Sequence, residues 1–259
     1  MKFIRSLQAH YRVVVALMLR EIATRYGRSP GGYIWAIIEP LGNVLILTAL
    51  FSFMARTPAV GRTFALFFAT GFFIFHAYRS TEAYVSKALN GNRSLLTFPV
   101  VTPYDVVIAR WFLQILTLIV IFPVLFTCVD LFIDETIRMN ALILVQAFTI
   151  ACLFALGAAM LNTIIFRKFP FYEKIFRIIT GPLLLVSGVI ILPENLPHPY
   201  GDILAWNPLV HLVAFFRTGF YPVYRAESLD MTYLLVWTVM LLFAGFCAFT
   251  WYADEAKES

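Results

Sequence analysis

Six apolar segments, each long enough to cross a lipid bilayer as a helix, dominate this sequence of 259 residues. A membrane helix needs about 20 mostly apolar residues to cross a hydrocarbon core of about 30 Å. Hydrophobic residues make up 61% of the chain and charged residues 14%, and a soluble domain of this length has too little interior to bury so many apolar side chains. We therefore predict an all-α, polytopic membrane protein. Its six transmembrane helices are expected at about 34–55, 64–84, 108–133, 141–166, 175–192 and 232–252.

Lys and Arg gather on one side of these segments. Fifteen of them lie in the N-terminal arm, in the loops after the second and fourth segments and in the tail, whereas five lie on the opposite side. Because short cytoplasmic loops collect Lys and Arg, both termini are predicted to be cytoplasmic, which agrees with an even number of spans. The same placement explains the net charge of +5 by topology and by contact with anionic lipid, and it argues against nucleic-acid binding.

The N-terminal arm, residues 1–29, has the pattern of an amphipathic helix that lies in the cytoplasmic interface. At the helical period its apolar side chains form one stripe, and three arginines lie on the opposite side. Gly27 and Pro30 end this helix and lead into the six-span domain, residues 30–259. Arg25 falls on the apolar stripe, where it either snorkels to the interface or faces a protein partner or a substrate headgroup.

The cytoplasmic loop at about 90–103 predicts a short helix. Ser94 or Asn92 is expected to cap this helix, and Pro99 follows its end. The loop is either a docking element for a cytoplasmic partner or a plain connection between two spans. Its other side chains of interest are Arg93, Leu95, Leu96 and Phe98.

The outer loop at about 193–231 is too long for a plain connection and too apolar for a solvated one. Irregular backbone survives at membrane depth only where it is buried in protein or lines a cavity. We predict two re-entrant helices here, the second beginning at Asn207-Pro208, because proline suits the first turn of a helix. Trp206 and the aromatic residues after it are expected to form an interfacial belt.

The sequence carries no catalytic pattern. Walker A (G-x-x-x-x-G-K-[ST]), H-E-x-x-H and G-x-S-x-G are all missing, so we expect no ATP or other cofactor on this chain and no enzyme activity of its own. The three cysteines are isolated within apolar runs, and no metal site is expected. Glu39, Arg79 and Glu82 are ionisable residues within the predicted spans. They are either functional or interface residues that snorkel and pair at i, i+3.

A resemblance to a known family begins at 19–40, where the sequence reads L-R-E-I-A-T-R-Y-G-R-S-P-G-G-Y-I-W-A-I-I-E-P. This stretch resembles the segment that leads into the first span of type-2 ABC exporter permeases. The loop at 92–103 is similar to their coupling helix, and Trp206-Asn207-Pro208 resembles their outer loop before the sixth span. The resemblance covers essentially the whole chain. The Ser-Pro-Gly-Gly-Tyr stretch departs from the Ser-x-Leu-Gly form of O-antigen and teichoic-acid exporters and looks more like the capsular-polysaccharide branch.

This resemblance implies a homodimeric permease of the bacterial inner membrane that works with two copies of a separate ATPase, which binds ATP and Mg²⁺. The dimer would thread an acidic, lipid-linked capsular polysaccharide through a channel lined mainly by spans one, two and five. In Gram-negative members a periplasmic co-polymerase and an outer-membrane export protein would be further partners. The residues implied to contact the ATPase are Arg25, Asn92, Arg93, Leu95, Leu96 and Phe98.

We place the polysaccharide pathway near the cytoplasmic ends of the first three spans. Aromatic rings stack on the C–H faces of sugars, and arginines attract carboxylates or phosphates. The residues of this hypothesis are Tyr33, Trp35, Glu39, Phe75, Tyr78, Arg79 and Arg110.

Three other functions stay open at this point. A secondary transporter or channel would use broken helices at 39–42 and 181–182, although the sequence shows no internal repeat. An exporter of O-antigen, teichoic acid or another glycolipid would share the same plan of spans. A membrane glycosyl or acyl transferase would need a cluster of Asp and His in its loops, which the sequence lacks.

Overall fold

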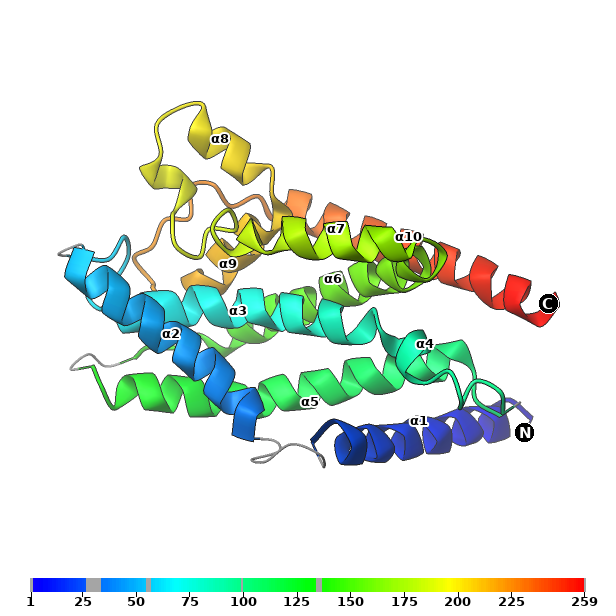
Figure 1. The fold of residues 1–259 in the computed structure, drawn as a ribbon. Coiled ribbons are helices and arrows are strands. Elements are labelled where there is room, and N and C mark those ends of the chain that lie inside the picture. Colours follow the sequence, from blue (N-terminus) through cyan, green and yellow to red (C-terminus); the bar gives the residue numbers. More distant parts are fainter. Residues whose placement is uncertain (1, 27–33, 55–56, 99, 134–136, 259) are drawn as a thin grey trace.

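The chain folds into an elongated bundle of helices, with no strand among the residues that the structure describes (Figure 1). This computed structural model describes residues 2–26, 34–54, 57–98, 100–133 and 137–258. The all-α prediction is confirmed over these ranges. The elements are α1 (Lys2–Tyr26), α2 (Ile34–Met54), α3 (Phe64–Val85), α4 (Ala88–Gly91), α5 (Pro103–Asp130), α6 (Ala141–Lys168), α7 (Pro170–Thr180), η1 (Pro182–Leu184), η2 (Pro193–Asn195), α8 (Tyr200–Ala205), α9 (Pro208–Thr218) and α10 (Met231–Glu258).

Four long helices, α3, α5, α6 and α10, run along the length of the bundle (Figure 1). Helix α6 packs against α3 and α10, and α3 also packs against α5. Helix α2 crosses α3 and α5 near one end of the bundle, and α1 lies along the other half of α5, next to α4. A second, smaller hydrophobic core joins α1 to the ends of α3 and α5 through Leu17, Val85, Leu89 and Val106.

Four of the helices are long and apolar enough to cross a membrane: α2, α5, α6 and α10. They correspond to the first, third, fourth and sixth predicted spans. The second predicted span forms one helix, α3, of 22 residues. Its last turns carry Arg79 and Glu82, and it is not among those four candidates.

The prediction of a continuous fifth helix over 175–192 is wrong. Helix α7 ends at Thr180, the short 3₁₀ helix η1 follows, and the chain continues in turns as far as Leu192. Pro182 lacks the N–H that would continue the ladder of α7, and Gly188 adopts a left-handed φ of 74° that reverses the chain. Composition alone qualified this segment as a span, but its Gly and Pro residues break the helix.

The cytoplasmic loop also differs from its prediction. Asn92 does not start a helix: it follows the end of α4, and its Nδ2 donates to the carbonyl of Ala88. Residues 92–98 form hydrogen-bonded turns, in which the Leu95 N–H donates to the Asn92 carbonyl at 2.9 Å. The predicted end at Pro99 lies outside the described residues. Helix α5 then begins with a capping box in which Thr102 and Asp105 satisfy each other's backbone N–H groups.

The outer loop does contain two short α-helices, α8 and α9. Asn207 caps α9 by accepting the N–H of Leu209 at 3.0 Å, and Pro208 occupies the first turn, as predicted. The amide Nδ2 of Asn207 also donates to the carbonyl of Val186 at 2.9 Å. The start of α9 is therefore tied to the turns that follow α7.

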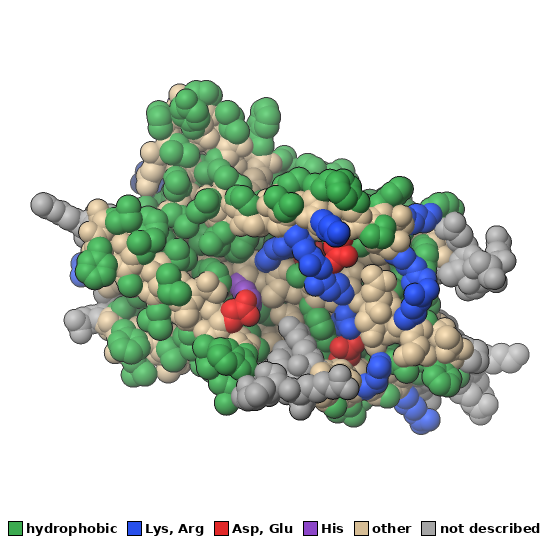
Figure 2. Space-filling model, in the orientation of Figure 1, with side chains coloured by type: hydrophobic (Ala, Val, Ile, Leu, Met, Phe, Trp, Pro, Cys, Tyr) green, Lys and Arg blue, Asp and Glu red, His purple; other side chains and the backbone are tan. Residues whose placement is uncertain are grey.

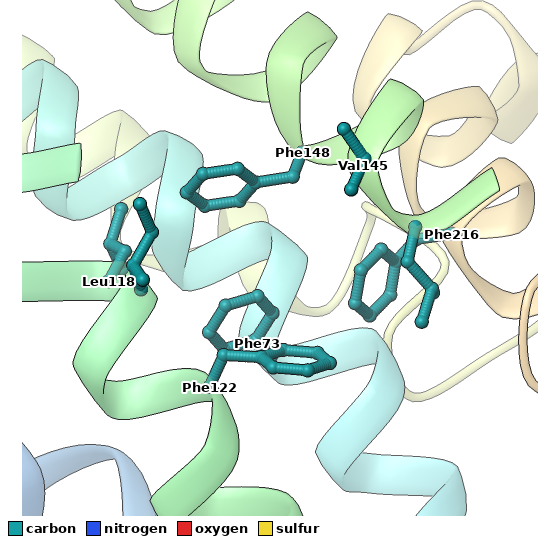
Figure 3. Close-up of a pocket in the computed structure, with 8 residues that line it drawn as sticks. Phe73, Leu118, Phe122, Val145, Phe148 and Phe216 are labelled. Carbon is teal, nitrogen blue, oxygen red and sulfur yellow. The ribbon is translucent and has the colours of Figure 1, made fainter. Parts of the chain in front are cut away.

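An apolar pocket of about 160 Å³ lies between α3, α5, α6 and α9 (Figure 3). Phe73 packs edge-on against Phe122, with ring centroids 5.2 Å apart, and Phe148 and Phe216 close the pocket. All the side chains that line it are hydrocarbon. It offers no polar group to a sugar, so it is not a candidate for the polysaccharide pathway.

Replacing Gly157 by alanine should destabilise the bundle, because Gly157 allows α6 and α10 to touch. A Cβ at Gly157 would lie 2.6 Å from the backbone of Leu241 and Leu242, so one helix must move. We expect a loss of at least about 1–3 kcal/mol, seen as a lower Tm of the purified protein in detergent. Gly42→Ala is the matched control, since no atom lies within 4 Å of its Cβ position. Equal Tm values for the two variants would contradict the prediction.

Candidate functional site

A buried polar cluster connects the N-terminal helix to the cytoplasmic loop and to α5. Glu21 is its centre: Oε1 accepts from Asn92 Nδ2 at 2.7 Å and from Arg110 Nε at 2.9 Å, and Oε2 accepts from the Tyr84 hydroxyl at 2.9 Å. Arg20 donates to the side-chain oxygen of Asn92 at 2.8 Å. We call these five residues the Glu21 cluster. It joins α1, the end of α3, the turn after α4, and α5.

The local sequence explains why the Glu21 cluster forms. Glu21 lies one turn after the buried Leu17, and the packing of Leu17 and Met18 on the smaller core carries its carboxylate inward. The guanidinium of Arg110 also lies over the Tyr84 ring, 4.8 Å from its centroid. A Cβ at Gly91 would lie 2.3 Å from Arg110 Nη2, so only glycine fits beside this guanidinium.

The carboxyl of Glu21 is held in its charged form. Burial by itself raises its pKa, but the hydrogen bond from Asn92 and the charge and hydrogen bond of Arg110 outweigh burial, and the pKa lies below its ordinary value. A second contact ties the same two helices together, with His10 Nδ1 2.9 Å from Asp105 Oδ1. Helix α1 is therefore attached at two points to the first turns of α5.

The stability that Glu21 supplies should depend on pH in a defined direction. A lowered folded-state pKa gives stability that is present above the ordinary carboxyl value of about 4.3 and is lost as the pH falls through the folded-state value. We expect the Tm difference between the wild type and Glu21→Gln to be constant from about pH 8 to 6 and to shrink only below about pH 4.3. A thermal-unfolding series in detergent measures this, and a difference that shrinks between pH 8 and 6 would contradict it.

The remaining residues of the predicted ATPase contact lie around this cluster. Arg93 is exposed, Leu95 and Leu96 are half-buried against the smaller core, and Phe98 is 58% exposed. The side chain of Arg25 lies outside the described residues. The turn therefore exposes both the Phe98 ring and Arg93, and its contact with an ATPase stays a prediction.

A second polar cluster joins α3 to α6 and α7. Arg79 donates to Glu82 at 2.7 Å and to the hydroxyl of Thr180 on α7 at 2.6 Å. Asn162 on α6 donates to the other oxygen of Glu82 at 2.8 Å. We call these four residues the Arg79 cluster. The predicted i, i+3 pairing of Arg79 and Glu82 is confirmed, and the cluster links α3 to both α6 and α7.

The structure disperses the seven residues that the pathway hypothesis named. Phe75 and Tyr78 are buried in the core of the bundle, and Arg110 belongs to the Glu21 cluster. Trp35 and Glu39 are exposed on α2, and Arg79 is half-buried. Tyr33 lies outside the described residues. The role of the seven in a pathway stays a prediction, and within this chain Trp35, Glu39 and Arg79 are the described members that present surface.

In the outer loop, Trp206 is 76% exposed. A second residue of this loop, Arg217, was not predicted as a site residue. Arg217 on α9 is fully buried, with its Nη2 donating to the carbonyl of Val189 at 2.7 Å and its Nη1 to that of Gly188. Its guanidinium lies 4.2 Å from the centroid of the Phe67 ring. Arg217 thus joins α9, the turn after α7, and α3.

The sequence contained a signal for some of the missed residues. Glu21 is an acid at the edge of an apolar stripe, and Arg217 is a basic residue at the end of an apolar run, and both patterns mark an ionisable residue with a buried partner. Asn162 and Thr180 sit in apolar helices without any spacing that would identify them. Among the described residues no group of His, Cys, Asp and Glu is placed to hold a metal ion.

The arrangement is suited to transmitting movement between elements. Its charged groups are paired or hydrogen-bonded across helices, which couples the turn at 92–98 to α1, α3 and α5. Comparison with known proteins identifies a family for this chain. Residues 12–221 match the family model described as ABC-2 type transporter.

Named relatives align along most of their length. The chain is 31% identical to the polysialic acid transport protein KpsM of Escherichia coli, over 90% of both chains. It is 25% identical to the capsule polysaccharide export inner-membrane protein CtrC of Neisseria meningitidis serogroup A, and 27% identical to the protein of the same description, BexB, of Haemophilus influenzae, each over 94% of this chain and 92% of the relative. The chain belongs to the ABC-2 type transporter family.

Proposed function

We propose that this chain is the transmembrane permease subunit of an ATP-driven exporter that moves capsular polysaccharide across the bacterial inner membrane. The observation that carries the proposal is the similarity, over about nine-tenths of both chains, to relatives named for capsule polysaccharide export and polysialic acid transport. ATP would be bound and hydrolysed by a separate chain, together with Mg²⁺, because no Walker A pattern occurs in this sequence.

The proposed topology has six crossings and cytoplasmic termini. Helices α2, α3, α5, α6 and α10 provide five of them, and α7 with the turns that follow it provides a broken fifth crossing. Helices α8 and α9 re-enter the membrane from the outside. The distribution of Lys and Arg supports the orientation. Re-entry is supported by the hydrogen bonds that Asn207 and Arg217 donate to backbone carbonyls, because these carbonyls lie outside helices and would otherwise lack a partner within the membrane.

The proposed assembly is a homodimer of this chain with two ATPase subunits. The ATPase docks on the turn at 92–98, and the Glu21 cluster carries its movement to α5, because Asn92 and Arg110 share one oxygen of Glu21. A periplasmic co-polymerase and an outer-membrane export protein complete the export route. In this proposal Trp35, Glu39 and Arg79, which present surface, would line the pathway, where the aromatic ring would stack on a sugar and Arg79 would attract acidic groups.

Export in the source cell tests the proposal. Deletion of the chain should abolish surface polysaccharide and leave polymer in the cytoplasm, and expression of the wild-type chain should restore the surface polymer. Restoration should fail when the Walker lysine of the partner ATPase is replaced. If export continues with the inactive ATPase, the chain is a secondary transporter or channel and the proposal is overturned.

Replacing Phe98 by alanine should weaken ATPase binding without loosening the fold, because its ring is 58% exposed at the proposed docking turn. An exposed aromatic anchor contributes about 1–2 kcal/mol or more to an interface, so the Kd should rise about 5- to 30-fold. Titration of the purified permease with the ATPase measures this. Tyr200→Ala is the control, an exposed aromatic on α8 of the outer loop. Unchanged affinity of the Phe98 variant would remove the turn from the interface.

A further inference from the structure

A basic hollow lies between the end of α3 and helix α7. Its volume is about 260 Å³, and it is open to the surface. Arg79 and Lys87 line it from α3 and the turn that follows, and Arg177 lines it from α7. Figure 2 shows Lys and Arg side chains gathered here, around a carboxylate.

The charges of the hollow leave an excess of positive charge. Glu82 and Glu173 also line it, but each is already engaged: Glu82 accepts from Arg79 and Asn162, and Glu173 pairs with Arg177. None of the carboxylates in the described part of the chain lies within ion-pair distance of Lys87, which is exposed. The pair on α7 is a surface i, i+4 pair of little energy, so Arg177 can turn to another anion.

Helix α7 is amphipathic, and the hollow lies on its charged side. Phe171, Ile178 and Ile179 are exposed on the opposite side of the helix, where the described part of the chain leaves them uncovered. The charged residues of α7 all lie before Ile178, so this end of the proposed fifth crossing suits the boundary between headgroups and acyl chains. An amphiphile at this boundary would place its anionic headgroup in the hollow and its hydrocarbon next to the apolar side of α7.

We propose that this hollow binds the phosphate headgroup of an acyl lipid. Lys87 and Arg177 are the two cations of the hollow that can turn to the oxygens of a phosphate ester, while Arg79 stays bonded to Glu82 and Thr180 and adds positive charge beside them. Charge-assisted hydrogen bonds from Arg are the strong ones. The lipid has two sources, a phospholipid of the bilayer or the lipid end of the exported polymer. The second source rests on the proposed function.

Lipid binding to the purified protein tests the site directly. Native mass spectrometry with phosphatidylglycerol and phosphatidylcholine gives the affinity for each lipid. We expect Lys87→Gln/Arg177→Gln to weaken phosphatidylglycerol binding at least about fivefold and to leave phosphatidylcholine binding unchanged. The matched control, Lys174→Gln/Arg225→Gln, removes the same charge from exposed positions outside the hollow and should bind within about twofold of the wild type. Equal weakening by both pairs, or by neither, overturns the proposal.

Two further measurements distinguish bilayer phospholipid from the lipid end of the exported polymer, and the lipid site from the proposed function. Inorganic phosphate should compete only weakly with phosphatidylglycerol, because it lacks the acyl chains that bind beside α7. If phosphate competes as strongly as the lipid does, the ligand is not an amphiphile and the proposal of a lipid site is overturned. Reduced surface polysaccharide in the Lys87/Arg177 variant assigns the site to the exported polymer, and normal export assigns it to bilayer phospholipid. If the wild-type chain itself supports no export, the proposed function fails, while the binding result still decides the site.

Discussion

Replacing Glu21 by methionine should lower the free energy of unfolding by about 3–5 kcal/mol, because it leaves the buried guanidinium of Arg110 without its carboxylate. The side chains of Glu21 and Arg110 are 8% and 9% exposed, so water cannot replace the lost partner. Asn92 and Tyr84 would lose an acceptor at the same time. For a chain of this length the loss corresponds to a Tm lower by about 6–20 °C.

A double-mutant cycle separates the ion pair from the other contacts of Glu21. The single variants Glu21→Met and Arg110→Met should each destabilise strongly, and the double variant should lose less than the two losses added, by about 0.5–3 kcal/mol. Arg12→Met, on the exposed side of α1, is the control and should stay within about 0.5 kcal/mol of the wild type. Additive losses would show that Glu21 and Arg110 act independently and would contradict a shared cluster.

The same variants test transmission. If the Glu21 cluster carries movement from the turn at 92–98 to α5, the less-than-additive loss of stability in the double variant should bring no gain in export, because the shared oxygen that links Asn92 to Arg110 is still missing. Surface polysaccharide and the Tm are measured on the same variants. Recovery of both together would mean that the cluster is structural only.

The long helices could be predicted from the sequence because one local property determines them. A backbone in hydrocarbon must satisfy its own hydrogen bonds, so an apolar run of sufficient length becomes a helix. The start of α9 was also readable, since Asn207 and Pro208 act through their own backbone neighbours. The fifth segment failed for a related reason: the apolar run met the length criterion, and Pro182 and Gly188 broke it locally.

The polar clusters could not be predicted in the same way. Glu21 meets Tyr84 and Arg110 across 63 and 89 positions in the sequence, and a single sequence carries no information on such pairings. Arg79 and Glu82 were found as a pair because they are three residues apart on one helix, but their partners Asn162 and Thr180 come from other helices. The sequence therefore identified the charged residues near the ends of the spans. Their partners could be identified only from the way the helices pack in the structure.

Replacing Arg217 by methionine should destabilise the outer loop by about 2–6 kcal/mol. Methionine keeps most of the volume but removes the donors to the carbonyls of Gly188 and Val189, and each buried carbonyl without a partner costs about 1–3 kcal/mol. The removed charge offsets part of this, since Arg217 is fully buried. Limited proteolysis of the chain between α7 and α10, together with the Tm, measures the loss. Arg225→Met, exposed in the same loop, is the control and should change neither.

Gly71→Ala tests the same contact from the other side, without changing Arg217. A Cβ at Gly71 would lie 2.5 Å from Arg217 Nη2 and 3.3 Å from the backbone of Val189, so the guanidinium must leave the carbonyl that it holds. Alanine is otherwise the better helix former in α3, and its propensity alone would stabilise by about 0.5–1 kcal/mol. A lower Tm with faster proteolysis of the outer loop therefore isolates the Arg217 contact. If Gly71→Ala is neutral or stabilising while Arg217→Met is not, the loss in the arginine variant comes from local packing, and Arg217 does not hold the outer loop to α3.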